Sequence, residues 1–237
     1  MTYIQGFVVA VPTANQQAYV DHATRAVPLF REFGATRMTE NWGDDVPDGK
    51  VTDFKGVVQA RDDETVLFSW IEYPDRAAAD AAGEKMMADP RMEALGDMPF
   101  DGKRMVYGGF APFVEQGPGG PMGYVDGFLV PVPTANREKY VDLAQQASAV
   151  FLDHGATRVV EAWGDNVPGG QITDFKRGTK AEPQEGIVFS WVEWPDKAAR
   201  DTGMKAVMSD ERMKGPHDTP FDGKRLIYGG FATVLDA

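Results

Sequence analysis

An internal repeat restricts the possible folds of this chain more than any other property of its sequence. Shifting the 237-residue sequence by 121 positions aligns it with itself without gaps, so that Tyr3 meets Tyr124 and Gly34 meets Gly155. About half of the aligned positions are identical, far above chance for a self-comparison. The segment EQGPGGPMG between the copies has the Gly/Pro content of a short exposed linker. We therefore expect a first unit at 1–116, a linker at 117–121 and a second unit at 122–237.

Two copies of this size do not make a solenoid, because solenoids stack three or more repeats of only 20–50 residues. Each copy is large enough to be a domain with a core of its own. We interpret the chain as a covalently joined homodimer, in which a two-fold interface is closed within one polypeptide. This interpretation predicts a monomer with internal pseudo-two-fold symmetry.

The residue pattern of one unit predicts five strands and two helices. A helical stripe of Tyr19, Ala23, Ala26 and Phe30 follows a possible N-cap at Thr13. The dipeptide DG at 48–49 suggests a hairpin between two extended runs. In chain order, the expected elements are a strand at 3–11, a helix ending before Gly34, strands at 36–44, 51–58 and 66–73, a helix at 74–88 and a strand at 103–113.

This order corresponds to an α+β, ferredoxin-like βαββαβ unit with an extra hairpin strand. A four-stranded antiparallel sheet with helices on one face leaves its other face bare, and that face has to be covered. The second copy supplies the cover, because two such sheets can face each other with their helices outside. We therefore expect two tandem units paired as an intramolecular dimeric α-β barrel.

Composition excludes several classes of function. The net charge of −12 disfavours nucleic acid and anionic membranes as partners. The absence of cysteine excludes disulfides and thiolate metal sites. No apolar run approaches the ~18–20 residues of a membrane span, and the opening residues lack the features of a signal peptide. We expect a soluble, cytoplasmic globular protein.

Alternation along the strands suggests where chemistry could take place. One face of the second strand carries Glu40 and Trp42, and one face of the strand at 66–73 carries Trp70 and Glu72. A carboxylate among aromatic side chains is typical of a ligand pocket, and burial would raise its pKa into the range of a general acid or base. The candidate proton carriers are Glu40, Glu161, Glu72 and Glu193. The candidate ligand-binding residues are Trp42, Trp163, Trp70, Trp191, Tyr107, Tyr228, Gln5 and Asp126.

A structural interpretation of the same residues stays open. The glutamates could form ion pairs at a rim, and the tryptophans could simply fill the barrel. Asp44 and Asp53 are more typical of turn residues that accept backbone hydrogen bonds than of metal ligands. His22 aligns with Leu143, and none of the three histidines recurs in both copies, which disfavours a two-fold haem or zinc site. We expect no metal and no tightly bound cofactor.

Several motifs resemble a known family. The sequences YxxGFxxxVP, WGDxVPxG, FSWxEYPD and PFDGKRMxYGGF resemble the YbaA-like bacterial proteins, a family without an assigned function. The resemblance covers nearly all of each copy and implies the dimeric α-β barrel superfamily. That superfamily also holds cofactor-free monooxygenases, haem enzymes of the chlorite-dismutase kind and stress-response barrels. The usual member is a single unit that dimerises, whereas this chain carries both units.

These observations leave two classes of function. The first is the binding or transformation of a small apolar or aromatic metabolite, in a cavity between the sheets and without a tightly bound cofactor. The second is a non-catalytic ligand-binding, stress-related or structural protein with a filled barrel. The sequence does not decide whether the protein is an enzyme.

Overall fold

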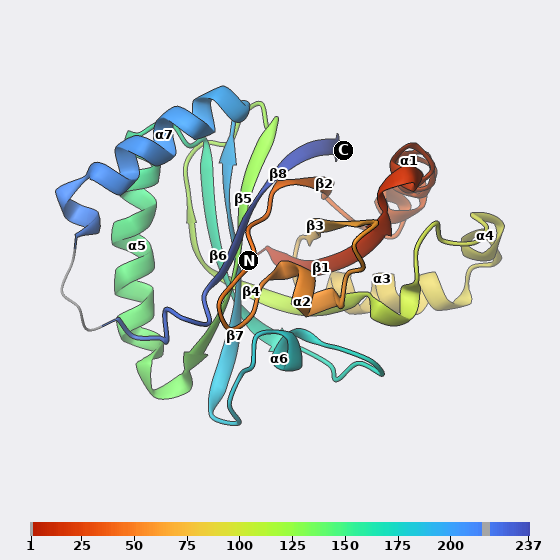
Figure 1. The fold of residues 1–237 in the computed structure, drawn as a ribbon. Helices are drawn as coiled ribbons and strands as arrows, with labels where there is room; N and C mark the ends of the chain where they lie inside the picture. Colours follow the sequence, from red (N-terminus) through yellow and green to blue (C-terminus); the bar gives the residue numbers. More distant parts are fainter. Residues whose placement is uncertain (1, 215–218) are drawn as a thin grey trace.

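The computed structural model describes residues 2–214 and 219–237 as one closed antiparallel β-barrel with helices packed on its outside (Figure 1). The strands are β1 (Tyr3–Pro12), β2 (Arg37–Asp45), β3 (Glu64–Tyr73), β4 (Val106–Gln116), β5 (Tyr124–Pro133), β6 (Arg158–Asn166), β7 (Glu185–Trp194) and β8 (Ile227–Asp236). The helices are α1 (Gln16–Glu32), α2 (Phe54–Val58), α3 (Arg76–Ala88), α4 (Pro90–Ala94), α5 (Arg137–Asp153), α6 (Phe175–Gly178) and α7 (Lys197–Ser209).

Each half contributes four strands to the barrel, in the order β4-β1-β3-β2 and β8-β5-β7-β6. The halves join at two seams, where β2 pairs with β8 and β4 pairs with β6. Helices α1 and α3 cover the outside of the first half, and α5 and α7 cover the second (Figure 1). The expected pair of βαββαβ units, joined as an α-β barrel, is therefore confirmed.

The prediction of an extra hairpin strand at 51–58 is wrong. Residues 54–58 form the short helix α2, because Asp53 caps it by accepting a hydrogen bond from the Gly56 amide at 2.7 Å. Asp53 also accepts from the Gly49 amide at 2.9 Å, so its carboxylate organises the preceding turn as well. Asp174 repeats the cap on α6 in the second half. The expected N-cap at Thr13 is also wrong, since Thr13 lies in a 3₁₀ turn without a side-chain cap.

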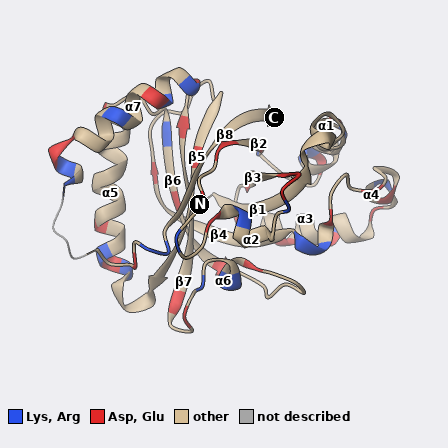
Figure 2. Ribbon diagram, viewed as in Figure 1, with Lys and Arg blue, Asp and Glu red and all other residues tan. Residues whose placement is uncertain are grey.

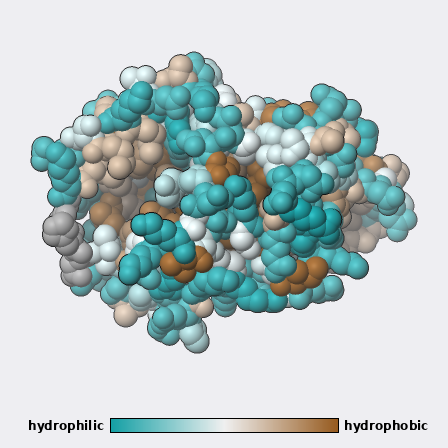
Figure 3. Space-filling view, viewed as in Figure 1, coloured by the Kyte–Doolittle hydropathy of each residue, from teal (hydrophilic) through white to brown (hydrophobic). Residues whose placement is uncertain are grey.

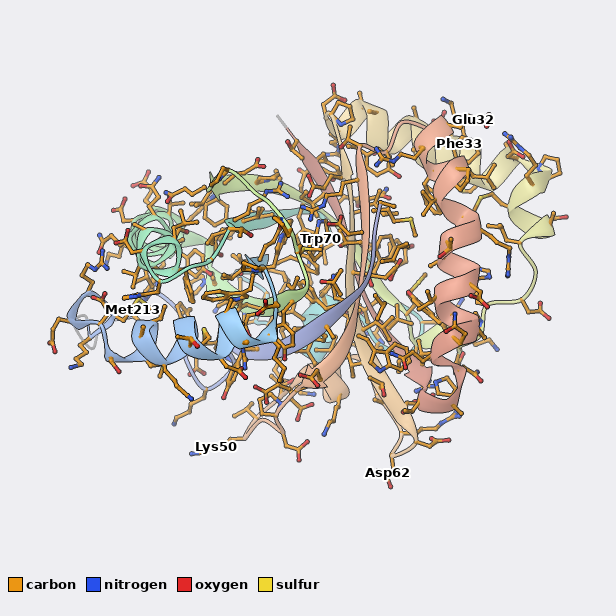
Figure 4. All side chains as sticks on the ribbon, turned by 90° about the horizontal axis from the view of Figure 1, so that it is seen from above. Glu32, Phe33, Lys50, Asp62, Trp70 and Met213 are labelled. Carbon is orange, nitrogen blue, oxygen red and sulfur yellow. The ribbon has the colours of Figure 1, made fainter. Side chains whose placement is uncertain are left out.

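Aromatic side chains fill the barrel. Phe68 stacks on Phe189 with ring centroids 4.3 Å apart, and Trp70 stacks on Trp191 at 4.2 Å, so each ring meets its counterpart from the other half. Figure 4 shows Trp70 at the centre of the molecule. Gly6 makes room for this stack, because a Cβ atom there would lie 2.8 Å from the Phe189 ring. The expected cavity between the sheets is thus occupied by the core.

The two ends of the barrel are closed differently. At one end α2 and α6 insert Phe54 and Phe175, both fully buried, and the Thr173 hydroxyl donates to the Val57 carbonyl at 2.6 Å. At the other end lies a cluster of charged side chains from both halves, which includes Arg37, Glu72, Arg158 and Glu193. Acidic and basic residues are interspersed along the helices, strands and loops (Figure 2). Among the described residues, the helices are too short or too polar to cross a membrane.

Candidate functional site

A pocket of about 480 Å³ lies in the first half, between the outer face of the sheet and the helices α1, α3 and α4. Strand β1 supplies Gln5 and Phe7 to its floor, and α1 supplies Tyr19 and His22 to its wall. Asn166 and Pro168, from the segment that ends β6, complete the wall from the second half. A pocket of this size and makeup is typical of small-molecule sites.

Methionine dominates the wall of this pocket. Six of the eleven methionines in the chain line it, together with Phe7, Phe30 and Phe100. Methionine is unbranched and polarizable, so such a wall adapts to apolar ligands of different shape. The methionines are Met38, Met86, Met87, Met92, Met98 and Met105. On the face shown in Figure 3, hydrophilic side chains predominate and hydrophobic ones form small separate patches.

Glu40 is a buried carboxylate on this apolar wall. Tyr19 on α1 donates its hydroxyl to Glu40 Oε2 at 2.7 Å, and Ser69 on the neighbouring strand β3 donates to the same oxygen at 2.5 Å. Loss of water raises the pKa of Glu40 to about 7, although these two hydrogen bonds oppose the rise. A carboxyl group with this pKa can both accept and donate a proton near neutral pH.

The second half repeats the arrangement around Glu161. Tyr140 donates to Glu161 Oε2 at 3.1 Å, and Ser190 stands at the position of Ser69. Burial raises the pKa of Glu161 to about 7 as well. The trio of Tyr, Glu and Ser is therefore a property of the fold that both halves retain.

Two polar atoms of the first half have no hydrogen-bond partner among the described residues, namely His22 Nδ1 and Tyr73 Oη. His22 lines the pocket, and burial lowers its pKa, so the imidazole is neutral near pH 7. A buried polar atom without a partner costs free energy, and a ligand that pairs with it recovers that cost. The His22 ring is thus available to a hydrogen-bonding group of a bound molecule.

Three of the proposed site residues line the pocket: Glu40, Gln5 and the half-exposed Tyr107. Trp42 shares the outer face with Glu40 but packs in the core beneath the helices. In the second half, Trp163 packs beside Phe113. Tyr228 is half-exposed, and Asp126 forms an ion pair with Arg200 at 2.7 Å.

The other proposed residues lie on the opposite face of the sheet, inside the barrel. Trp70 and Trp191 form the stacked pair described above, and each indole donates to a glutamate two residues further on, Glu72 or Glu193. Arg158 contacts both glutamates, at 2.7 and 3.1 Å. The two tryptophans and the two glutamates thus form one buried structural cluster around Arg158, and the sheet separates this cluster from the pocket.

Tyr19, Ser69 and His22 belong to the site but were not singled out from the sequence. In the sequence, Tyr19 belongs to a helical apolar stripe, which is typical of a core residue, and Ser69 is one residue within a predicted strand. A signal was present, since Tyr, Glu and Ser recur at 121-residue spacing as Tyr140, Glu161 and Ser190. Within residues 2–214 and 219–237, no three His, Asp or Glu side chains are grouped as metal ligands would be.

The closed eight-stranded barrel with outer helices defines this protein as a dimeric α-β barrel whose two units are fused. Structures with the same fold include a candidate monooxygenase from Fusobacterium nucleatum (TM-score 0.61, 8% identity, 99% of this chain and 93% of that chain). Another is a candidate monooxygenase from Lactobacillus acidophilus (TM-score 0.58, 11% identity, 100% of this chain and 95% of that chain). An anthrone oxidase-like protein also matches (TM-score 0.57, 12% identity, 100% and 92%).

The chain belongs to the family described as "Protein of unknown function (DUF1428)", which matches it twice, over residues 2–102 and 123–223. Its curated relatives include the uncharacterised protein YbaA of Escherichia coli K12 and that of Shigella flexneri. Each is 57% identical over 117 residues, which cover 49% of this chain and 100% of the relative. The resemblance drawn from the sequence motifs is confirmed.

Proposed function

We propose that the first-half pocket binds a small apolar or aromatic molecule and that Glu40 exchanges a proton with it. The observation that supports this most strongly is a buried carboxyl, with a pKa of about 7, on the wall of a methionine-lined pocket. A general acid or base works best when its pKa lies near the operating pH. No tightly bound cofactor is needed for such a proton transfer.

The makeup of the pocket narrows the ligand to a neutral molecule with one polar group. Methionine and phenylalanine side chains favour an aromatic or aliphatic body, and a neutral His22 favours a hydroxyl, carbonyl or amine. Phenols and enolisable ketones have both properties, and each has an acidic hydrogen that a carboxylate can remove. In the proposed step the Glu40 carboxylate takes that proton, and the electron pair stays on the substrate as a phenolate or enolate.

Solvent deuterium exchange tests the proton transfer without knowledge of the natural substrate. An enolisable ketone with a fused aromatic ring, such as 2-tetralone, is incubated with the protein in D₂O, and loss of its acidic C–H signal is followed by NMR. We expect the protein to accelerate exchange, Glu40→Gln to abolish the acceleration, and Glu161→Gln to retain it. Binding of the ketone without any acceleration would favour the alternative of a non-catalytic binding protein.

The role of His22 is tested with its own counterpart in the repeat. His22→Leu installs the residue found at Leu143, so the change is compatible with the fold. Loss of one hydrogen bond should weaken binding of 2-naphthol by about tenfold, while binding of naphthalene stays the same. Equal weakening of both ligands would indicate that His22 only shapes the pocket.

A further inference from the structure

The two halves differ at two positions that line the pocket, Gln5 and Gly83, and at two positions on the adjoining elements β3 and α3, Tyr73 and Ala79. Four residues of the first half are replaced in the second by larger or charged ones: Gln5 by Asp126, Tyr73 by Trp194, Ala79 by Arg200 and Gly83 by Met204. The Tyr, Glu and Ser trio is kept in both halves. These four positions near the trio therefore differ in size or charge, whereas the trio itself does not.

In the second half these replacements bind one another. Arg200 forms an ion pair with Asp126 at 2.7 Å and with Asp45 of the first half at 2.8 Å. The Trp194 indole donates to Asp126 at 2.9 Å, and the Arg200 guanidinium lies 5.4 Å from the Tyr124 ring. The polar groups of these side chains are thus paired within the protein and are not free to bind a ligand.

The apolar replacements take up space as well. A Cβ atom on Gly83 would meet nothing within 4 Å, so α3 leaves room beside the first-half pocket. In the second half, α7 places Met204 in a cluster with Trp194 and Phe151. The Trp194 ring lies so close to α7 that a Cβ atom on Gly203 would be 2.4 Å from it.

We infer that this chain binds ligand in its first half only, because side chains of the second half occupy the matching site. The first part of this inference, that the first-half pocket binds a ligand, rests on the proposed function. The second half still contributes to the first-half site, since Asn166 and Pro168 complete the wall of that pocket. A single chain should accordingly bind one molecule of ligand, although its fold contains two copies of the unit.

Xenon diffraction measures the empty space directly. Apolar cavities take up xenon, so crystals of the full chain under xenon pressure should show it between α1, α3 and the sheet. The matching space near Trp194 and Met204 should show none. Xenon of equal occupancy in both halves would overturn the inference, whatever the protein binds in solution.

Titration with N-phenyl-1-naphthylamine, a neutral aromatic amine, measures the stoichiometry. We expect one probe molecule per chain. Gly83→Met, which copies the second half, should weaken probe binding by about tenfold or more, and Met204→Gly should leave first-half affinity unchanged. The quadruple variant Asp126→Gln, Trp194→Tyr, Arg200→Ala and Met204→Gly copies the first half and should raise the stoichiometry from one to two.

The two proposals fail in different ways. Two probe molecules per wild-type chain, or a Gly83→Met variant with full affinity, would refute the inference that only the first half binds ligand. Neither result would refute the binding of apolar ligands. Absence of probe binding, with xenon confined to the first half, would refute the proposed class of ligand but support the inference that only the first half has an empty site. Because wild type and Gly83→Met suffice for this test, the inference stays refutable even if the quadruple variant does not fold.

Discussion

Replacing Glu40 by glutamine should change how the stability of the protein depends on pH. Burial raises the pKa of Glu40 from 4.5 to about 7, so the folded state holds this proton more tightly than the unfolded chain. A group of this kind contributes its full stability below the unfolded pKa of 4.5. That contribution is lost as the pH rises through the folded pKa of about 7.

The size of the effect follows from the shift. A difference of about 2.5 pKa units, at 1.36 kcal/mol per unit, corresponds to about 3 kcal/mol between acid and alkaline pH. About 2 kcal/mol of this falls between pH 5.5 and 8.5, where carboxylates with lowered pKa stay ionised in both states. Glutamine cannot ionise, and its amide oxygen can still accept hydrogen bonds from Tyr19 and Ser69.

The assay is urea unfolding, followed by tryptophan fluorescence at half-unit steps from pH 5.5 to 8.5. Relative to Glu40→Gln, the wild type should lose about 2 kcal/mol of unfolding free energy across this range. Because burial raises the pKa of Glu161 to the same value, Glu161→Gln should behave like Glu40→Gln, and relative to the double variant the wild type should lose about 4 kcal/mol. Glu84→Gln, a change at an exposed glutamate on α3, is the matched control and should follow the wild type.

Parallel profiles for wild type and Glu40→Gln would refute the reasoning. They would mean that Glu40 ionises with the same pKa in the folded and unfolded chain. The argument for Glu40 as a proton carrier at neutral pH would then fail with it, because that argument depends on the same loss of water around the carboxyl group.

Three further predictions concern stability and are checked by thermal or urea unfolding. Gly6→Val should destabilise the protein by about 1–3 kcal/mol, because the new side chain would collide with the Phe189 ring; unchanged stability would mean that the stacked core is loosely packed. Arg158→Met should cost about 3–5 kcal/mol, since Glu72 and Glu193 would lose a shared buried partner, and Lys139→Met on the surface is its control. Asp53→Ala should cost about 1 kcal/mol through loss of the α2 cap, and Asp53→Asn should cost less, because its single amide oxygen can keep the bond from Gly56 but not also the one from Gly49; equal loss in both variants would mean that the cap contributes little.

The candidate site could be predicted only in part. Alternation correctly placed Glu40 and Trp42 on one strand face, and Trp70 and Glu72 on another, because side chains of a strand point alternately to its two sides. Alternation does not say which face turns inward. Trp70 and Glu72 therefore looked like pocket residues, although they lie inside the barrel, and Glu40 faces the helices.

Local chemistry also misled at α2. The DG turn and the β-branched residues after it are typical of a hairpin, but Asp53 caps a helix instead, and Phe54 closes the end of the barrel. The hairpin prediction failed because the burial of Phe54, Val57 and Val58 against residues distant in the chain outweighs the weak strand preference of five residues.

The sequence by itself determined the repeat, the α+β class, the closure of two sheets on one another and the family. Each of these follows from periodicity and self-similarity, which are properties of the chain order. Only the tertiary structure decided that the barrel is solid, that the pocket lies outside it, and which of the differences between the halves lie near Glu40 and Glu161. Those outcomes depend on whether side chains from separate elements fill a shared volume, and packing of that kind is set by three-dimensional neighbours rather than by spacing along the chain.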